Sequence, residues 1–222
     1  MIKAIIFDFD GTILDTETPW YYAFRDAYKE YGVELSLELY STCIGTSNDV
    51  FNPYEYLSTE HGIQIDKQSF KKAIHLEHTA RMEREEMRPG IRELLERAKA
   101  EGLRIGLASS SPYKWVDNYL ISLGIRDYFE CIRTSDHVTK VKPDPELYLQ
   151  ALEALGVEAA EAVAIEDSPN GARAAIAAGM HCVVVPNELT KVLAFDASPL
   201  YYPVDSFDEV DWRRFAAAPR EK

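Results

Sequence analysis

The chain has 222 residues, 46% of them hydrophobic and 27% charged, which is ordinary globular composition and enough length for one large domain or a core with a smaller attached domain. Its 24 basic and 37 acidic side chains give a formal net charge of −13. This charge argues against nucleic acid or an anionic membrane as a bulk partner, because both select basic surfaces. Three widely spaced cysteines, no leader-like start and no apolar run near the roughly 18 residues of a membrane span favour a protein of the reducing cytoplasm.

The first expected element is a strand at residues 3–9, an apolar run that leads into Asp8-Phe9-Asp10-Gly11-Thr12. Residues two apart lie on the same side of an extended backbone, so Asp8 and Asp10 would bring two carboxylates together at the end of a buried strand. Such a pair is repulsive unless positive charge compensates it. A plain turn at Asp10-Gly11 is the alternative for this segment.

The next part of the chain is expected to be helical. No convincing strand occurs between residues 16 and 87, and helices are expected at residues 18–31, about 48–61 and 66–86. A crossover between strands needs only about 10–12 residues or a little more. We therefore expect an inserted helical cap domain at residues 16–85, and an α/β core formed by residues 1–15 and 86–222.

Strands and helices alternate after this insert. Helical spacing of apolar residues occurs at 91–98 and 148–155, and residues 170–178 are alanine-rich, with Pro or Gly at the boundaries of these expected helices. Short apolar runs at 103–109, 129–133, 162–166 and 181–186 are expected strands. The alternation predicts a doubly wound, mostly parallel Rossmann-like α/β sheet, in which ligands bind beyond the carboxyl ends of the strands.

Chemically useful side chains follow the ends of four expected strands. They comprise a hydroxyl, an ammonium and four carboxylates: Ser109, Lys142, Asp8, Asp10, Glu166 and Asp167. Because the carboxyl ends of parallel strands lie at one edge of a sheet, these groups are expected to meet there. Each has an ordinary alternative. Ser109 could cap a helix, Lys140 could replace Lys142, and Glu166-Asp167-Ser168 could be the polar start of a helix.

Together these motifs resemble the haloacid dehalogenase-like (HAD) hydrolase superfamily, in its group of sugar-phosphate phosphatases and β-phosphoglucomutase with a helical cap. DFDGT is similar to the first motif of that family, Ser109 to the second, KPDPE to the third and EDSPNG to the fourth, in the same order. The resemblance implies that Asp8 is a nucleophile that forms an aspartyl-phosphate, and that Asp10 is the general acid and then the general base.

The resemblance also implies a cofactor and a phosphate site. Mg²⁺ would be bound by Asp8, Asp167 and the backbone carbonyl of Asp10, with Glu166 beside it or in the next layer. Lys142 would neutralise the nucleophile and the phosphoryl group. Hydrogen bonds to the phosphoryl oxygens are expected from the group formed by Ser109, Ser110 and the amides near Gly11 and Thr12.

Within the family, the enzymes that act on phosphate esters have a second aspartate in the first motif. In this chain the second aspartate is Asp10. The expected function is a Mg²⁺-dependent phosphomonoesterase that hydrolyses a small phosphorylated metabolite, such as a sugar phosphate. Candidate substrate contacts lie in the insert and could equally be core or surface of that domain: Trp20, Tyr21, Thr46, Ser47 and Asn48. His75 and His78 lack a third metal ligand and are expected on a solvated helix face.

Two alternatives accompany this expectation. A β-phosphoglucomutase-like phosphomutase is disfavoured because that enzyme has a histidine where Trp20 aligns and an arginine where Asn48 aligns. A non-catalytic binding protein on the same fold is disfavoured because every motif position carries its functional residue. The expected partner is a small phosphate ester, and the expected assembly is a monomer or a small homo-oligomer.

Overall fold

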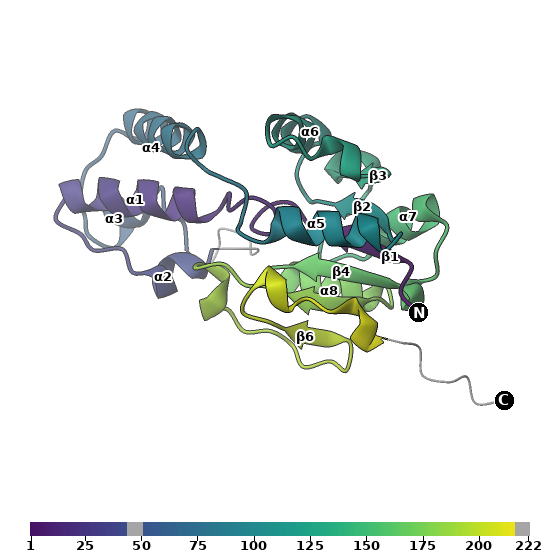
Figure 1. The fold of residues 1–222 in the computed structure, drawn as a ribbon. Coiled ribbons are helices and arrows are strands. Elements are labelled where there is room, and N and C mark those ends of the chain that lie inside the picture. Colours follow the sequence, from purple (N-terminus) through teal and green to yellow (C-terminus); the bar gives the residue numbers. More distant parts are fainter. Residues whose placement is uncertain (44–50, 216–222) are drawn as a thin grey trace. The chain divides into compact units, whose positions relative to one another are not determined.

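The computed structural model describes residues 1–43 and 51–215 (Figure 1). The chain forms two compact units. The α/β unit comprises Met1–Leu14, Glu86–Asn187 and the chain from Ala194 onward, and the helical unit comprises Asp15–Glu85 and Glu188–Leu193. The predicted insert, residues 16–85, included neither Asp15 nor the segment 188–193. In the part of the chain that is described, no helix has the length and apolarity needed to cross a membrane.

A six-stranded sheet forms the centre of the α/β unit, and all its strand pairs are parallel, in the order β3-β2-β1-β4-β5-β6. The predicted α/β class with a parallel Rossmann-like sheet is confirmed. Only the sixth strand escaped prediction, because it is three residues long, half-exposed and ends in a proline. The strands are β1 (Ala4–Phe7), β2 (Arg104–Ala108), β3 (Cys131–Arg133), β4 (Ala162–Glu166), β5 (His181–Val184) and β6 (Tyr201–Pro203).

Helices cover both faces of this sheet. Strands β2 and β3 lie on one side of β1 and strands β4 and β5 on the other, so right-handed crossovers put the helices of each half on opposite faces (Figure 1). The four helices are α5 (Ile91–Ala100), α6 (Tyr113–Ser122), α7 (Glu146–Leu155) and α8 (Pro169–Ala177). The last two pack with Ala4 and Ile6 of β1 in one buried apolar cluster.

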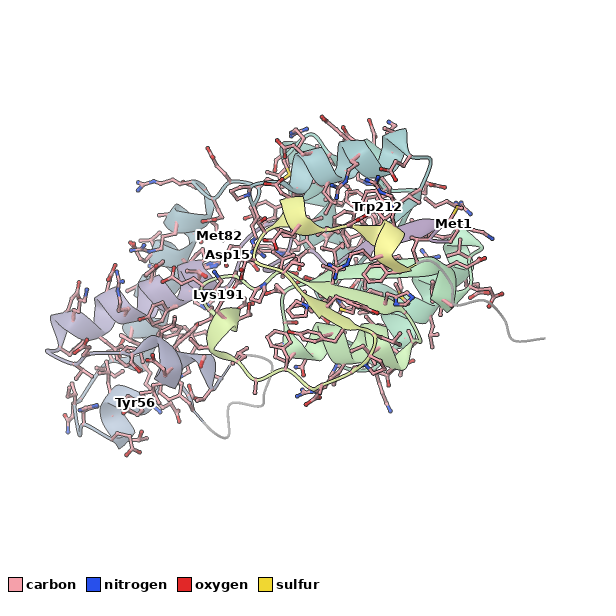
Figure 2. The ribbon with its side chains drawn as sticks, turned by 60° about the horizontal axis from the view of Figure 1, so that its bottom comes forward. Met1, Asp15, Tyr56, Met82, Lys191 and Trp212 are labelled. Atoms are coloured by element: carbon pink, nitrogen blue, oxygen red, sulfur yellow. The ribbon has the colours of Figure 1, made fainter. Side chains whose placement is uncertain are left out.

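Short 3₁₀ turns also occur in the described residues, η4 in the helical unit and the others in the α/β unit. They are η1 (Arg126–Tyr128), η2 (Ser135–His137), η3 (Ala159–Glu161), η4 (Thr190–Val192), η5 (Phe207–Glu209) and η6 (Trp212–Phe215). In η6, the buried Trp212 (Figure 2) donates its indole N–H to Oε2 of Glu101 at 2.9 Å. This bond ties the end of the described chain to the turn that follows α5.

The helical unit is built around aromatic side chains. Its helices are α1 (Thr18–Glu30), α2 (Leu37–Ser41), α3 (Tyr56–Thr59) and α4 (Lys67–Met82), and Tyr28 and Phe24 of α1 are buried in its core. The helix predicted at about 48–61 is only α3 within the described residues. Asn52 explains part of this, because its side chain accepts the amide of Tyr54 and forms a turn that competes with helix.

The two chain segments that flank the insert pair with each other inside the α/β unit. Leu14 and Met87 form an antiparallel bridge, and the amide of Arg88 donates to the carbonyl of Ile13 at 2.9 Å. The guanidinium of Arg88 donates to the carbonyl oxygens of Gly11 at 2.7 Å and Val185 at 2.8 Å. These bonds fasten the turn after β1 beside the end of β5, which sets the position of Asp10.

Candidate active site

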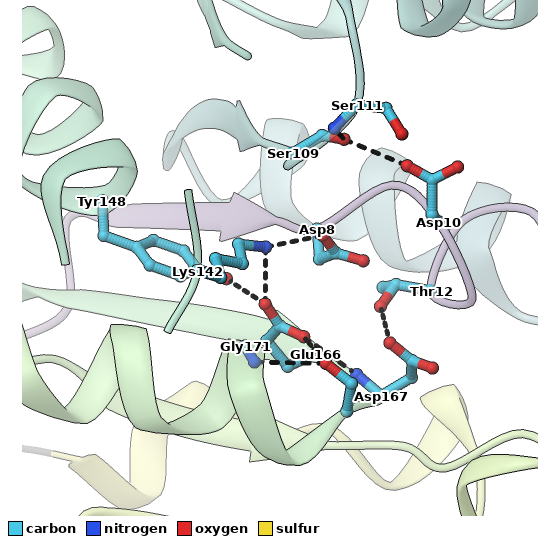
Figure 3. Close-up of polar contacts among 11 residues, drawn as sticks. Asp8, Asp10, Thr12, Ser109, Ser111, Lys142, Tyr148, Glu166, Asp167 and Gly171 are labelled. Carbon is cyan, nitrogen blue, oxygen red and sulfur yellow. Dashed lines mark hydrogen bonds and ion pairs between the residues drawn. The ribbon is translucent and has the colours of Figure 1, made fainter. Parts of the chain in front are cut away.

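The predicted motif residues lie at one edge of the sheet because the backbone hydrogen bonds between strands continue beyond the carboxyl ends of β1 and β2. The amide of Asp8 donates to Ile165 at 2.9 Å, and the amide of Ser109 donates to Arg133 at 2.9 Å. The first residue after β1 and the first after β2 are thus held in extended pairing. The Asp8 side chain lies close to Glu166 of β4 and to Lys142 from the loop after β3, and the Ser109 side chain lies next to Asp10 (Figure 3).

Lys142 forms the centre of a buried charged cluster. Its Nζ lies 2.6 Å from Oδ1 of Asp8 and 2.6 Å from Oε1 of Glu166, and its side chain is 6% exposed. Tyr148 of α7 donates its hydroxyl to the same Glu166 oxygen at 2.6 Å (Figure 3). Lys140, the alternative lysine, is exposed. The geometry therefore brings Lys142 to the two carboxylates.

Burial and charge act against each other in this cluster. Burial alone would lower the pKa of the Lys142 ammonium, but the charges of Asp8 and Glu166 outweigh it and keep that pKa above its usual value. Burial raises the pKa of Asp8 to about 7, because Glu166 and Asp10 add to the effect of desolvation and Lys142 offsets only part of it. Lys142 is thus a firmly charged cation, while Asp8 needs further positive charge to be fully ionised at neutral pH.

Glu166 is enclosed on all sides. Its Oε1 accepts from Lys142 and Tyr148, and its Oε2 accepts from the amide of Asp167 at 3.3 Å and the hydroxyl of Ser168 at 3.4 Å. A Cβ atom at Gly171 would lie 1.9 Å from this carboxylate, so α8 can approach only with glycine there. Gly171 is therefore required for packing. Because both carboxylate oxygens of Glu166 already accept hydrogen bonds, these contacts favour a position for Glu166 next to the ligands of a metal ion rather than among them.

Asp167 is buried and held from two directions. Its Oδ1 accepts from the Thr12 hydroxyl at 3.4 Å, and its Oδ2 accepts from the side-chain amide of Asn187 at 3.0 Å. Gly11 has a φ of +85°, and a Cβ there would lie 2.3 Å from Oδ2 of Asp167, so this turn also requires glycine.

One predicted role does not fit this turn. The amide of Gly11 donates to Leu14 at 2.7 Å and the amide of Thr12 donates to Phe9 at 3.2 Å. These two donors are used inside the turn itself, which disfavours them as donors to a phosphoryl group. The Thr12 side chain is likewise fully buried and contacts Asp167.

Asp10 is half-buried and lies across the site from the charged cluster around Lys142. Its Oδ2 accepts from the Ser109 hydroxyl at 3.1 Å, and its Oδ1 accepts from the indole of Trp115 at 2.9 Å. Ser109 is fully buried and its oxygen also accepts the amide of Ser111 at 3.0 Å. Ser109 therefore supports the Asp10 carboxylate and does not cap α6. Ser110 is exposed.

The carboxylates fit a divalent cation. One oxygen from each of Asp8, Glu166 and Asp167 lies within 4.8 Å of the others, and all three residues are buried. When all three carboxylates are ionised, they and the single ammonium leave two negative charges in excess, which one divalent ion would neutralise. All-oxygen donors of this kind suit Mg²⁺.

The remaining predicted residues belong to the helical unit. Trp20 is half-buried and its ring stacks on His78, with centroids 3.6 Å apart, while Tyr21 is buried and bonded to the carbonyl of Leu35. Both thus have packing contacts inside their own unit. Thr46, Ser47 and Asn48 lie outside the described residues.

Four contributors to the site were not predicted: Trp115, Tyr148, Asn187 and Arg88. Asn187 could have been found, because it follows β5 as the motif residues follow their strands. Trp115 and Tyr148 lie in the first turns of helices, where they look like ordinary amphipathic positions. Arg88 contacts backbone carbonyls, which leave no trace in the sequence.

Comparison with known proteins agrees with this geometry. Residues 5–185 match the family described as haloacid dehalogenase-like hydrolase. A candidate phosphatase named YhcW, from Bacillus subtilis (strain 168), is 48% identical over 196 residues, which cover 88% of this chain and 89% of that protein. The phosphorylated carbohydrates phosphatase of Thermotoga maritima is 34% identical over 181 residues, covering 81% and 82% of the two chains.

A solved structure is similar to this chain in both fold and sequence. The crystal structure of a candidate β-phosphoglucomutase from Thermotoga maritima has a TM-score of 0.67 and 31% identity, covering 90% of this chain and 89% of that one. This chain belongs to the haloacid dehalogenase-like hydrolase family. The predictions of the family and of an enzyme that hydrolyses phosphate monoesters are both confirmed.

Proposed function

We propose that this chain is a Mg²⁺-dependent phosphomonoesterase that acts on a small phosphorylated metabolite of the sugar-phosphate class through an aspartyl-phosphate. The observation that carries the proposal is the buried contact of Asp8 with Lys142, beside Asp167 and across from Asp10. The names of two relatives, a candidate phosphatase and a phosphatase of phosphorylated carbohydrates, support the substrate class.

In the first half of the reaction, an oxygen of Asp8 attacks phosphorus. The bond between phosphorus and the ester oxygen breaks, and Asp10 gives its proton to that departing oxygen. Lys142 remains charged next to Asp8, so it stabilises the charge on the attacking carboxylate and on the phosphoryl group.

In the second half, water attacks the phosphorus of the aspartyl-phosphate. Asp10 accepts the proton of this water, the bond between phosphorus and Asp8 breaks, and inorganic phosphate is released. Both side chains then return to their starting protonation. Asp8 and Asp167 would hold Mg²⁺, which supplies the positive charge that Asp8 needs to be ionised at neutral pH.

The test is phosphate release from a panel of sugar phosphates, with and without a chelator. We expect Mg²⁺-dependent turnover, and a loss of at least about a thousandfold in Asp8→Asn, because an amide cannot form the intermediate. Lys140→Met is the control, because this exposed lysine lies outside the buried cluster. Turnover that survives in Asp8→Asn at the wild-type rate would exclude the assigned nucleophile.

The similarity to a candidate β-phosphoglucomutase keeps the mutase as a second candidate. Its test is incubation with β-glucose 1-phosphate and a trace of the 1,6-bisphosphate. A mutase gives glucose 6-phosphate, whereas the proposed phosphatase gives free sugar and phosphate. Binding of a phosphate ester without either product would favour a non-catalytic protein.

A further inference from the structure

A tryptophan outside the sequence motifs contacts Asp10. Trp115 lies in the first turn of α6 and donates its indole N–H to Oδ1 at 2.9 Å, while Ser109 donates to Oδ2 at 3.1 Å. Each carboxylate oxygen therefore accepts a bond from a different part of the chain. The terminal torsion of an aspartate is otherwise broad and soft, so two such bonds restrict the rotation of the carboxyl.

The indole is itself held in place by packing. Its ring meets Tyr119 edge to face, with centroids 4.8 Å apart, and Tyr119 contacts Phe9 at 6.1 Å. Phe9 is fully buried and precedes Asp10 directly. An indole N–H can only donate, so its bond is available whether the carboxyl is charged or protonated. The contact can thus persist through both halves of the reaction.

We propose that Trp115 is a positioning residue that holds the Asp10 carboxyl in the orientation from which it transfers protons. This inference rests on the proposed acid–base role of Asp10 and adds the residue that orients it. Proton transfer requires heavy atoms within hydrogen-bond reach, and displacements of about 1 Å can lower rates by roughly a hundredfold. Loss of the indole N–H should therefore weaken proton transfer more than nucleophilic attack.

The experiment compares two esters in wild type and Trp115→Phe, with Mg²⁺ present. An alkyl ester such as glycerol 2-phosphate needs a proton on its leaving oxygen, whereas p-nitrophenyl phosphate releases a stable phenolate without one. The ratio kcat/KM covers the steps through formation of the aspartyl-phosphate, so it reports the acid role of Asp10. We expect kcat/KM to fall about tenfold or more for the alkyl ester, and much less for the aryl ester.

Trp212→Phe is the matched control. Trp212 also donates its indole N–H to a carboxylate at 2.9 Å, but the acceptor is Glu101, which follows α5 and also pairs with Arg213. This variant removes the same kind of bond and should leave the ratio of the two kcat/KM values unchanged. A general loss of stability would affect both esters alike, whereas misplacement of Asp10 affects the alkyl ester selectively.

The outcomes separate this inference from the proposed function. If wild type hydrolyses both esters and Trp115→Phe lowers them equally, or leaves both unchanged or raised, the positioning role is excluded and the phosphatase remains. If wild type hydrolyses neither, the proposed function fails first. Should Trp115→Phe not fold, the benzothiophene analogue of tryptophan at position 115 alone keeps the ring shape without the N–H, and the same selective loss is expected.

Discussion

The two units bury titratable side chains in different protonation states, charged and paired in the α/β unit and neutral in the helical unit. In the α/β unit, the buried Lys142 keeps its charge because its Nζ lies 2.6 Å from a carboxylate oxygen of Asp8 and 2.6 Å from one of Glu166. In the helical unit, His78 is buried against the ring of Trp20, and burial lowers its pKa to about 4, so it is neutral near pH 7. A buried ion pair keeps its side chains charged, but it is stable only while each charge has its partner. A neutral histidine stacked on an aromatic ring contributes packing and needs no charged partner. The charged residues proposed for catalysis accordingly lie in the α/β unit.

The largest effect is expected where pairing is broken in the α/β unit. Lys142→Met leaves Asp8 and Glu166 buried together without their cation, so we expect a loss of about 3–5 kcal/mol in the free energy of unfolding. Urea unfolding in the presence of a chelator measures it, because a bound metal would compensate the carboxylates. Lys140→Met is the control and should change stability by less than about 0.5 kcal/mol, since Lys140 is exposed. Equal effects in both variants would show that the buried carboxylates do not depend on Lys142 for their stability.

This contrast also marks how far the sequence reaches. The residues at the strand ends were predictable, because each stands directly after an apolar run and parallel strands bring those positions to one edge. The choice of Lys142 over Lys140 needed the resemblance to the family, since both follow the same strand. The site partners from helices, Trp115 and Tyr148, depend on tertiary packing that no local pattern records.

The helical unit was less predictable for a physical reason. His78 was expected on a solvated face, which is wrong, because Trp20 from another helix covers it. Its neighbour His75 is exposed, as expected. Short elements such as α2 have too few residues to show a helical period, and their position depends on the aromatic core around Tyr40.

The second prediction tests the neutral histidine. The pKa of His78 is lowered in the folded chain, so between about pH 6.5 and pH 4 the unfolded chain binds a proton there that the folded chain does not. Stability contributed by this group is present above that window and is lost as the pH falls through it. We expect wild type to lose about 1–2 kcal/mol more than His78→Phe between pH 7 and pH 4.5.

Urea unfolding at several pH values gives this comparison, and only the difference in slope matters, because carboxylates titrate in both proteins. His61→Phe is the control, since His61 is exposed in the same unit. It should retain the wild-type slope. If His78→Phe keeps the same slope as wild type, the histidine is charged in the folded chain and the contrast between the units disappears.

The smallest effect compares one serine from each unit. Ser168 caps the start of α8 and Ser36 caps the start of α2, and each accepts a backbone amide at 3.1 Å, from Gly171 and from Leu39. Replacing either by alanine removes the same cap, so we expect a similar loss of about 1 kcal/mol in each unit.

Only Ser168 also donates to Glu166, at 3.4 Å. Ser168→Ala should therefore lower kcat/KM by about two- to tenfold, the effect of one hydrogen bond, while Ser36→Ala leaves it unchanged. Equal stability losses with unequal activity losses would show that the two caps stabilise their helices equally, and that only the cap in the α/β unit also supports turnover. Equal activity losses would show that the bond from Ser168 to Glu166 has no separate effect on turnover.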